Sequence, residues 1–296
     1  MMTTRAFLFV STVGLVSLIT GLTAHSALAT EFPFDPVGAR HVGMGGASAA
    51  VWLGPEAIYH NPASLVWQTL SFSGGMQPIQ WTRHPRSWWM HFYNKETAYG
   101  VPAALIAQGW DYNGASGESH YFDLGLPFAF NLTEITPGAA TIHFAFEQRG
   151  DGKWEFDMPI DLGFLARHSS GATLGIVARG LTIGSNGLES VNERIEYGAS
   201  YGVGGMLTMS SSVVWFKGED WETALKRYRI GGEYGGANRV HLLGGYLHEP
   251  DDSWYATGGI ALRSDAAGRY EFIYSAAYDP DREILRHYVQ YGVRMF

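Results

Sequence analysis

Hydrophobic and polar residues alternate one by one through short segments spread over most of the chain after residue 69. Between residues 156 and 166 the even positions are apolar, whereas the odd positions include Asp157, Asp161 and Gly163. Successive side chains of a β-strand point to opposite faces, so a period of two predicts strands with one apolar and one charged face. The same division recurs in residues 121–130 and 269–278. We therefore expect an all-β chain.

Turn signals between these segments divide the chain into about fourteen candidate strands. Most are about 10 to 13 residues long, the length that a tilted strand needs to cross a bilayer. Beyond residue 29, no apolar run approaches the ~18 residues that a membrane helix needs. We therefore expect a transmembrane antiparallel β-barrel. The candidate strands are 70–81, 87–93, 97–108, 121–131, 139–149, 155–168, 171–183, 195–206, 211–217, 224–235, 238–249, 254–263, 268–278 and 285–296.

The connections between these strands differ on the two sides of the expected barrel. The longest, 109–120 and 184–194, would face outward. Tight turns on the side of both chain ends would face the periplasm; they are 94–97, 169–171, 235–238 and 265–268. Tryptophans near strand ends favour the aromatic girdles of a membrane barrel, the alternative being the core of a soluble β-sandwich. They are Trp81, Trp88, Trp89, Trp110, Trp154, Trp215, Trp221 and Trp254.

The first 29 residues have the features of a secretory signal. Arg5 supplies the positive charge, residues 6–22 the apolar stretch, and residues 27–29 the small-residue cleavage site. We expect three parts: a signal peptide (1–29), an N-terminal hatch (30–68) and the barrel (69–296). An uncleaved membrane anchor is the alternative for the first part. The chain has no cysteine and an acidic balance without a basic run, which excludes thiol chemistry and gives nucleic acid nothing to bind.

Residues 38–67 form a long stretch of the mature chain that lacks strand periodicity. Glycines and alanines make it slim, and the span 47–52 could form a helical turn or two before Gly54 and Pro55 break it. Asn61 and Pro62 are a turn signal. A barrel of fourteen strands encloses more space than its wall side chains can fill, so we expect this stretch to plug the lumen. The alternative is an ordinary compact N-terminal segment.

The same stretch resembles a known family. Gly38-Ala39-Arg40, the run 43–47 and the run 56–65 look like the N-terminal hatch of the FadL-type outer-membrane proteins, which transport long-chain fatty acids and aromatic hydrocarbons. They are also similar to the hatch of the barrel component of the type IX secretion system. The family usually has an Asp where this chain has Leu53-Gly54-Pro55. The hatch motif consists of Gly43, Gly45, Gly46, Asn61, Pro62 and Ala63.

The resemblance implies a function in the outer membrane of a Gram-negative-type bacterium, after insertion by the barrel assembly machinery. The first hypothesis is passive uptake of a hydrophobic small molecule, with no cofactor. The second is a barrel that binds or passes on exported proteins, which the short outward connections favour. Aromatic residues of the hatch could contact a ligand or merely form the hatch core. The ligand-binding candidates are Phe32, Phe34, Trp52, Tyr59 and Trp67.

Charged residues on the polar faces of the strands would line the lumen. Arginine suits such a place because its planar fork binds carboxylates bidentately. We expect these residues to hold hatch and wall together, with a substrate relay as the alternative. The expected lumen charges are Asp123, Glu147, Asp157, Asp161, Arg167, Arg179, Arg227, Arg229, Glu233, Arg263, Arg269 and Glu271.

The sequence shows no recognisable enzymatic or metal-binding motif. Histidines are scattered without the spacing of a zinc site, and there is no Gly-x-Ser-x-Gly nucleophile motif. Glycine-rich spots at 43–46 and 202–205 do not stand between a strand and a long helix, as a dinucleotide loop requires. We therefore expect neither a metal site nor an enzyme.

Overall fold

The computed structural model describes the chain from residue 37 to residue 294 with gaps. The described residues are 37–52, 54–68, 70–77, 87–94, 101–114, 117–133, 135–182, 188, 193–235, 239–264, 269–281 and 283–294, with backbone alone at 112–114 and 117. The signal peptide, Phe32, Phe34 and Trp81 lie outside these residues.

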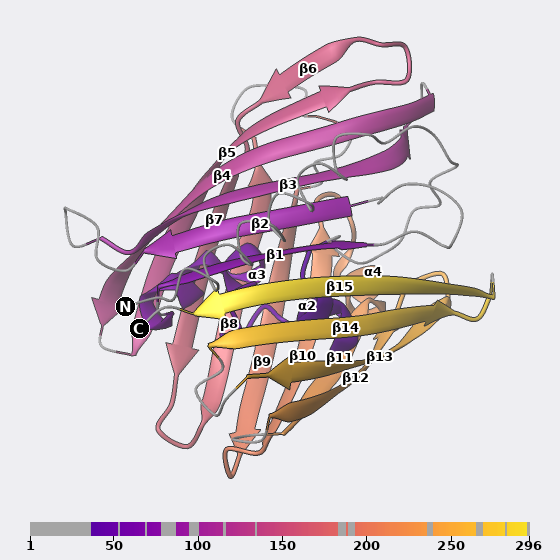
Figure 1. Cartoon of the computed structure of the whole chain (residues 1–296). Helices are drawn as coiled ribbons and strands as arrows, with labels where there is room; N and C mark the ends of the chain where they lie inside the picture. Colours follow the sequence, from indigo (N-terminus) through magenta and orange to yellow (C-terminus); the bar gives the residue numbers. More distant parts are fainter. Residues whose placement is uncertain are drawn as a thin grey trace.

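The strands form one antiparallel sheet that closes on itself (Figure 1). Except for β6 and β7, each strand pairs with its neighbour in the chain, and β15 pairs with β1 across the seam. The strands are β1 (Ser71–Gln77), β2 (Ser87–Asn94), β3 (Ala103–Gly114), β4 (Gly117–Thr133), β5 (Thr136–Gln148), β6 (Trp154–Asp157), β7 (Ile160–Arg167), β8 (Ala172–Leu181), β9 (Arg194–Val203), β10 (Leu207–Phe216), β11 (Tyr228–Tyr234), β12 (Val240–His248), β13 (Trp254–Arg263), β14 (Tyr270–Asp279) and β15 (Ile284–Arg294).

Two of these strands, β6 and β7, are halves of one. Both pair with β5, β6 through residues 145–148 and β7 through residues 138–142. The break falls at Met158 and Pro159, where proline has no N–H for the ladder. With β6 and β7 counted as one, the wall has fourteen strands, which confirms the expected barrel. We call the end where β15 finishes at Arg294 the near end, and the opposite end the far end.

Two strand boundaries differ from the prediction at the far end. The span 109–120 is predicted as an outward loop, but its described residues, 109–114 and 117–120, continue β3 and β4 as paired strands, with Trp110 opposite Tyr121 and Gly114 opposite Gly117. Its glycines and polar residues suggested a loop, but pairing with the facing strand overrides that local preference. The predicted strand 224–235 starts later because α4 (Trp221–Lys226) occupies its first residues. Asp220 caps this helix by accepting a hydrogen bond from Thr223 N at 2.8 Å.

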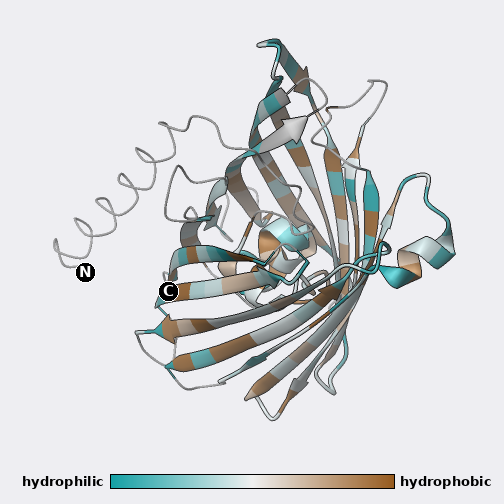
Figure 2. Ribbon diagram, turned by 90° about the vertical axis from the view of Figure 1, so that its right-hand side faces the viewer, coloured by the Kyte–Doolittle hydropathy of each residue, from teal (hydrophilic) through white to brown (hydrophobic). Residues whose placement is uncertain are grey.

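Side-chain parity follows the prediction. Along β4, Phe128 is 37% exposed and Phe130 44%, whereas Asp123 is fully buried on the inner face. Along β14, Phe272 is exposed and Ile273 is buried. Figure 2 shows the resulting succession of hydrophobic and hydrophilic residues along the strands. The isolated chain therefore presents an apolar outer surface and a largely polar inner one.

The described part of the hatch, residues 37–52 and 54–68, is buried almost throughout and contains α2 (Ala39–Gly43), α3 (Ala57–His60) and the 3-10 helix η1 (Pro62–Trp67). Helix α2 packs against β12 to β15, while η1 packs against β4, β5 and β7, so the hatch reaches from one wall to the other. This confirms a partly helical plug in the lumen. The helical turn expected at 47–52 is wrong: helices form on either side of it. None of the described helices is long and apolar enough to cross a membrane.

Candidate functional site

Glycines of the wall let the hatch backbone lie directly on the sheet. A Cβ added at Gly231 would overlap Met44 O, and one at Gly175 would overlap Ala49 O, far inside van der Waals contact in both cases. Gly245 faces Gly45 N in the same way. These wall glycines therefore form a bed on which backbone rests without intervening side chains. The sequence prediction named the hatch glycines and missed those of the wall.

The hatch glycines have matching roles. A Cβ at Gly43 would come within 2.6 Å of Ser275 Oγ, and one at Gly45 within 2.6 Å of Tyr246 N. Gly45 and Gly46 also have φ values of 66° and 78°, in the left-handed region that glycine favours. The other part of the motif caps η1, because Asn61 Oδ1 accepts a hydrogen bond from Ala63 N at 3.1 Å.

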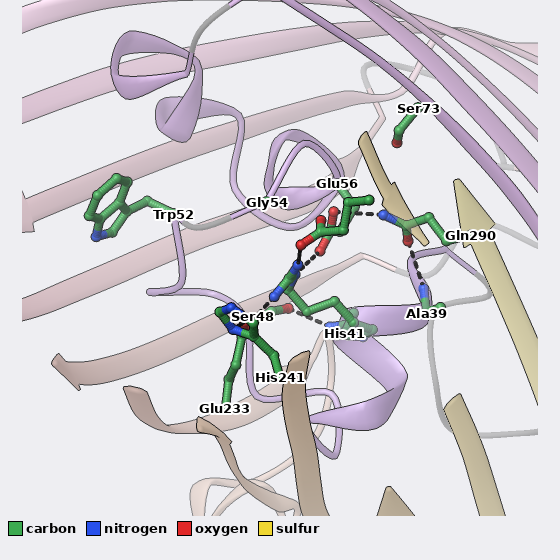
Figure 3. A network of polar contacts seen from close by, with 12 residues as sticks. Ala39, His41, Ser48, Trp52, Gly54, Glu56, Ser73, Glu233, His241 and Gln290 are labelled. Carbon is green, nitrogen blue, oxygen red and sulfur yellow. Dashed lines mark hydrogen bonds and ion pairs between the residues drawn. The ribbon is translucent and has the colours of Figure 1, made fainter. Parts of the chain in front are cut away.

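Arg40 is the hub of a buried ion cluster that joins α2 to the wall. Its Nε lies 2.8 Å from Glu56 Oε1, its Nη2 lies 2.5 Å from Glu271 Oε1, and its Nη1 contacts Glu233. Gln290 of β15 completes the cluster by accepting from Ala39 N at 2.9 Å and donating to Glu56 Oε2 at 2.8 Å. Figure 3 shows Glu56, Glu233 and Gln290 of this cluster, which come from the hatch and from separate strands. One guanidinium therefore ties the hatch segment to β11 and β14.

Burial sets the electrostatics of this cluster. Burial works against a charge on Arg40, but Glu233, Glu271 and Glu56 outweigh it and hold the pKa of the guanidinium well above its usual value. Burial also raises the pKa of Glu56, and the nearby Arg40 offsets that rise only in part. Arg40 is therefore permanently charged, and Glu56 takes up a proton more readily than an ordinary glutamate does.

A second polar network runs around the opposite wall. Gln108 donates to Asp123 at 2.8 Å, and His143 bridges Asp123 (2.7 Å) and Asp161 (3.4 Å). Further along the wall, Arg179 lies 3.7 Å from Asp161 and 3.6 Å from Glu196, and Glu196 pairs with Arg229 at 2.7 Å. We call these seven residues, on β3, β4, β5, β7, β8, β9 and β11, the polar belt.

The polar belt also holds the hatch. Arg179 donates to Tyr59 O at 2.7 Å and to His60 O at 2.5 Å, and so binds the C-terminal end of α3. Arg229 Nη1 donates to Gly46 O at 3.4 Å. Buried carbonyls need such donors, so the belt satisfies hatch backbone groups while it ties neighbouring strands together.

The structure divides the expected lumen charges among several places. Asp123, Asp161, Arg179 and Arg229 lie in the polar belt. Glu233, Glu271 and Arg263 lie in the Arg40 cluster, where Arg263 Nε is 2.8 Å from Glu271 Oε1.

The remaining five residues lie outside both networks. At the far end, Arg227 pairs with Glu219 (2.7 Å) and Glu249 (2.8 Å). Glu147 is buried, and its Oε1 lies 3.8 Å from Arg149 Nε. Asp157 Oδ1 accepts a hydrogen bond from Met158 N at 2.7 Å. At the near end, Arg167 and Arg269 are exposed.

Two of the candidate ligand-binding aromatics come together. Trp52 and Trp67 meet edge to face with ring centroids 5.9 Å apart, and the Arg167 guanidinium lies 4.4 Å over the Trp52 ring. Tyr59 lies elsewhere: its hydroxyl donates to Met90 O and, at 3.2 Å, to Ala107 O. Burial and the charge of Asp123 raise the pKa of Tyr59 well above its usual value, so the phenol remains a donor. Tyr59 therefore fastens α3 to β2 and β3.

The wall is continuous at Gly74 and Gly75 and interrupted beside Pro127. Gly74 and Gly75 pair on both sides, and the Trp89 ring covers Gly75. Between β3 and β4, pairing stops at Ile106 with Gly125 and resumes at Ala103 with Phe128, so these described strands lack two pairs beside Pro127. Proline has no N–H to donate there. The β3–β4 ladder therefore has a break in the near-end half of the wall.

Sequence reasoning missed Arg40, Glu56 and Gln290 as site residues. It also missed His241, whose Nδ1 lies 2.7 Å from Glu233 Oε1. Arg40 and Glu56 nevertheless carry a signal, because they are the two charged residues in the otherwise apolar or neutral span 37–68. Opposite charges in a segment destined for burial predict a partner for each. Their wall partners have no local signal. Among the described residues, no group of three or more His, Cys, Asp and Glu is placed to hold a metal ion.

The geometry of this plugged fourteen-stranded barrel matches that of solved structures. The toluene transporter TbuX of Ralstonia pickettii superposes with a TM-score of 0.64 at 13% identity, over 90% of this chain and 100% of that one. The CymD monoaromatic hydrocarbon channel gives 0.66 at 12% identity, over 90% and 99%. A Pseudomonas aeruginosa FadL homologue gives 0.55 at 10% identity, over 86% and 95%. This chain has the FadL-type barrel fold.

Over the whole chain, the FadL-type likeness is one of structure, while the overall sequence identity is low. Neither the protein-family models nor the curated proteins contain a match to this chain. Identities of 10 to 13% show the fold alone. What the barrel transports must therefore be argued from its own residues.

Proposed function

We propose that this protein is an outer-membrane barrel for passive uptake of a hydrophobic small molecule. The observation that carries the proposal is the hatch: an N-terminal segment fastened across the lumen of a closed barrel whose outer surface is apolar. An apolar outer face suits a bilayer, and a fastened plug suits a selective path rather than an open pore. The FadL-type fold, shared with a toluene transporter and a monoaromatic hydrocarbon channel, supports the same reading.

The proposed orientation puts the near end in the periplasm and the far end outside, in a Gram-negative-type outer membrane. The hydrophobic molecule would enter at the far end and meet the hatch. It would leave either as the hatch shifts or through the wall beside Pro127, where the ladder between β3 and β4 is interrupted. A wall exit releases an apolar molecule into lipid, which spares it the transfer into water.

Trp52 and Trp67 are the proposed ligand contacts in the described hatch. They are partly buried and meet next to an apolar cluster that includes Leu65 and Leu165. Burying an apolar group of side-chain size against such surfaces contributes about 1.5 to 3 kcal/mol. Phe32 and Phe34 are proposed as further contacts from the sequence alone.

A binding experiment tests this function. Purified protein in amphipol should bind a fluorescent fatty acid or an aromatic hydrocarbon, and Trp52→Ala should weaken binding. Trp221→Ala is the matched control, because Trp221 is 51% exposed on α4, which packs on β10 and not on the hatch. Absence of binding, or equal losses in both variants, would contradict the proposal.

The second hypothesis, passage of exported proteins, receives no support from the solved structures compared above. Co-purification of an exported protein with the intact barrel would reinstate it. The division into signal peptide, hatch and barrel is likewise proposed, and N-terminal sequencing of the mature protein should begin at Thr30. Depletion of the barrel assembly machinery should stop its insertion.

A further inference from the structure

Helix α4 lies on the outer side of the barrel wall. The ring of Trp221 meets Trp215 of β10 and Tyr197 of β9 edge to face, with ring centroids 6.4 and 6.1 Å apart. Both partners point outward, because their neighbours Val214 and Glu196 are fully buried on the inner face. Figure 2 shows α4 beside the ring of strands, outside the lumen that holds the hatch helices. The helix therefore belongs to the outer surface of the wall.

Several contacts hold α4 in this place. Ala224 is fully buried where the helix packs on β10. Arg227, just after the helix, donates two hydrogen bonds of 2.7 and 2.9 Å to the carboxylate of Glu219, just before it. Trp215 Nε1 also donates to Glu219 O, at 2.8 Å. Both ends of the helical segment are therefore fastened to each other and to the wall.

The exposed surface of α4 has an apolar flank and a charged flank. Trp221 is 51% exposed and Leu225 50%, and residues four positions apart lie on the same side of a helix. Glu222 and Lys226 are exposed as well and form a second row, about 100° further round the helix. Such a division between apolar and charged flanks suits a boundary between lipid and water.

The apolar flank continues the lipid-facing surface of the barrel. Tyr197 and Trp215 stand on that surface near the far ends of β9 and β10. Amphipathic rings of this kind favour the level at which lipid headgroups meet acyl chains. Because Trp221 packs on both rings, it lies at the same level, and Leu225 lies on the same side of the helix.

The size of the apolar flank favours lipid over protein as the partner. A stable protein–protein interface buries about 1,200 Å² or more in total, which is far more than two exposed side chains can supply. Lipid chains, by contrast, cover an apolar side chain without needing a complementary surface. Lipid already covers the adjacent wall in a membrane barrel, so the same partner extends over Trp221 and Leu225.

We propose that α4 is a lipid anchor, which inserts Trp221 and Leu225 into the outer leaflet beside the wall while Glu222 and Lys226 stay in water. The partner is the boundary between headgroups and acyl chains in that leaflet. This inference concerns how the barrel is seated in the membrane, and it does not depend on which molecule the barrel transports. Because α4 is fastened to β10, the anchor fixes the depth of this side of the wall.

Spin labels test the anchor, because the chain has no cysteine and a single introduced cysteine can be labelled alone. Leu225→Cys and the matched control Lys226→Cys place nitroxides on the two flanks of one helix. Leu242→Cys provides the reference for lipid, since Leu242 is 56% exposed on the outer face of β12. The protein is placed in phosphatidylcholine vesicles, with a nickel chelate on both sides of the membrane.

Oxygen concentrates in lipid and the nickel chelate stays in water, so the ratio of the two accessibilities reports the surroundings of each label. We expect the ratio at Leu225 to lie close to that at Leu242 and clearly above that at Lys226. Equal ratios at Leu225 and Lys226 would overturn the anchor, because both flanks would then face the same solvent.

Two other results would also overturn it, for different reasons. A label at Leu225 that is shielded from both reagents would be covered by protein. A second copy of the chain would then show as spin–spin broadening that unlabelled protein removes. If the label at Leu242 is open to the nickel chelate, the wall itself does not face lipid. The membrane barrel and the uptake function would then fail together with the anchor, whereas a failure at Leu225 alone leaves them standing.

Discussion

Replacing Arg40 by methionine should release the hatch from the wall. Methionine keeps most of the volume but removes the charge that three buried carboxylates share, two of them at 2.8 and 2.5 Å. Arg40 is 1% exposed, so water cannot take its place without moving the hatch. Removing one partner of a buried ion pair costs about 3 to 5 kcal/mol, because it leaves the other charge uncompensated. We expect a loss of stability in that range.

Two measurements report this loss. Urea unfolding of the protein in lipid vesicles gives the change in stability, and chymotrypsin cleavage at hatch residues such as Trp52, Tyr59 and Trp67 reports undocking. The control is Arg239→Met, because Arg239 is exposed at the near end. Adding Glu56→Gln and Glu271→Gln to Arg40→Met should restore part of the stability, since fewer charges are then stranded.

A small effect would refute the reasoning. Arg40→Met could instead cost less than about 1 kcal/mol, with its hatch as resistant to chymotrypsin as that of Arg239→Met. The cluster would then contribute no more stability than an exposed salt bridge does, and it would not fasten the plug.

Three further predictions concern the glycine bed, the hatch acid and the wall. Gly231→Ala should cost about 1 to 3 kcal/mol by pushing Met44 off β11, whereas Gly244→Ala, with nothing within 4 Å, should be nearly neutral; equal unfolding midpoints would contradict this. Because burial raises the pKa of Glu56 above 4.5, ionising it costs the folded state more than the unfolded one, so its contribution should fall as pH rises from about 4.5 through the raised folded-state pKa. Glu56→Gln should lose that slope in unfolding midpoints measured against pH, and an unchanged slope would assign it to another group. Pro127→Ala restores a backbone N–H at the break in the β3–β4 ladder. This N–H should point toward β3, because Ala129 N, two residues further on, donates to Pro102 O at 3.0 Å. Ligand release should then slow without a change in affinity, and unaltered release would argue against a wall exit there.

Parity made the barrel wall predictable from sequence. Each strand needs one face for water and one for lipid. Phe128 can therefore be assigned to the outer face and Asp123 to the inner face without knowledge of their partners. The hairpin at 109–120 was not predictable in the same way, because its glycines and polar residues favour loops locally and only the facing strand decides otherwise. Helix α4 was missed although Asp220 is a good cap, since six residues give too short a pattern.

The site was less predictable than the wall. Four of the expected lumen charges do lie in the polar belt and three in the Arg40 cluster, because inward parity identifies them. Nothing local identifies Glu233 or Glu271 as partners of Arg40, which lie 193 and 231 residues away. The role of the wall glycines is equally unpredictable, since a glycine in a strand does not indicate which backbone segment will approach it.

The sequence separations in the Arg40 cluster bear on how the protein is made. Arg40 emerges early in synthesis, but its acceptors stand on β11 and β14, and Gln290, which completes the cluster, on the last strand. Contacts of this kind form late because long loops must close first. Complete docking of the hatch therefore requires β11, β14 and β15 to be in place. In a nascent barrel that lacks its final strands, Arg40 does not have all its acceptors. Docking of the hatch therefore depends on the completeness of the barrel.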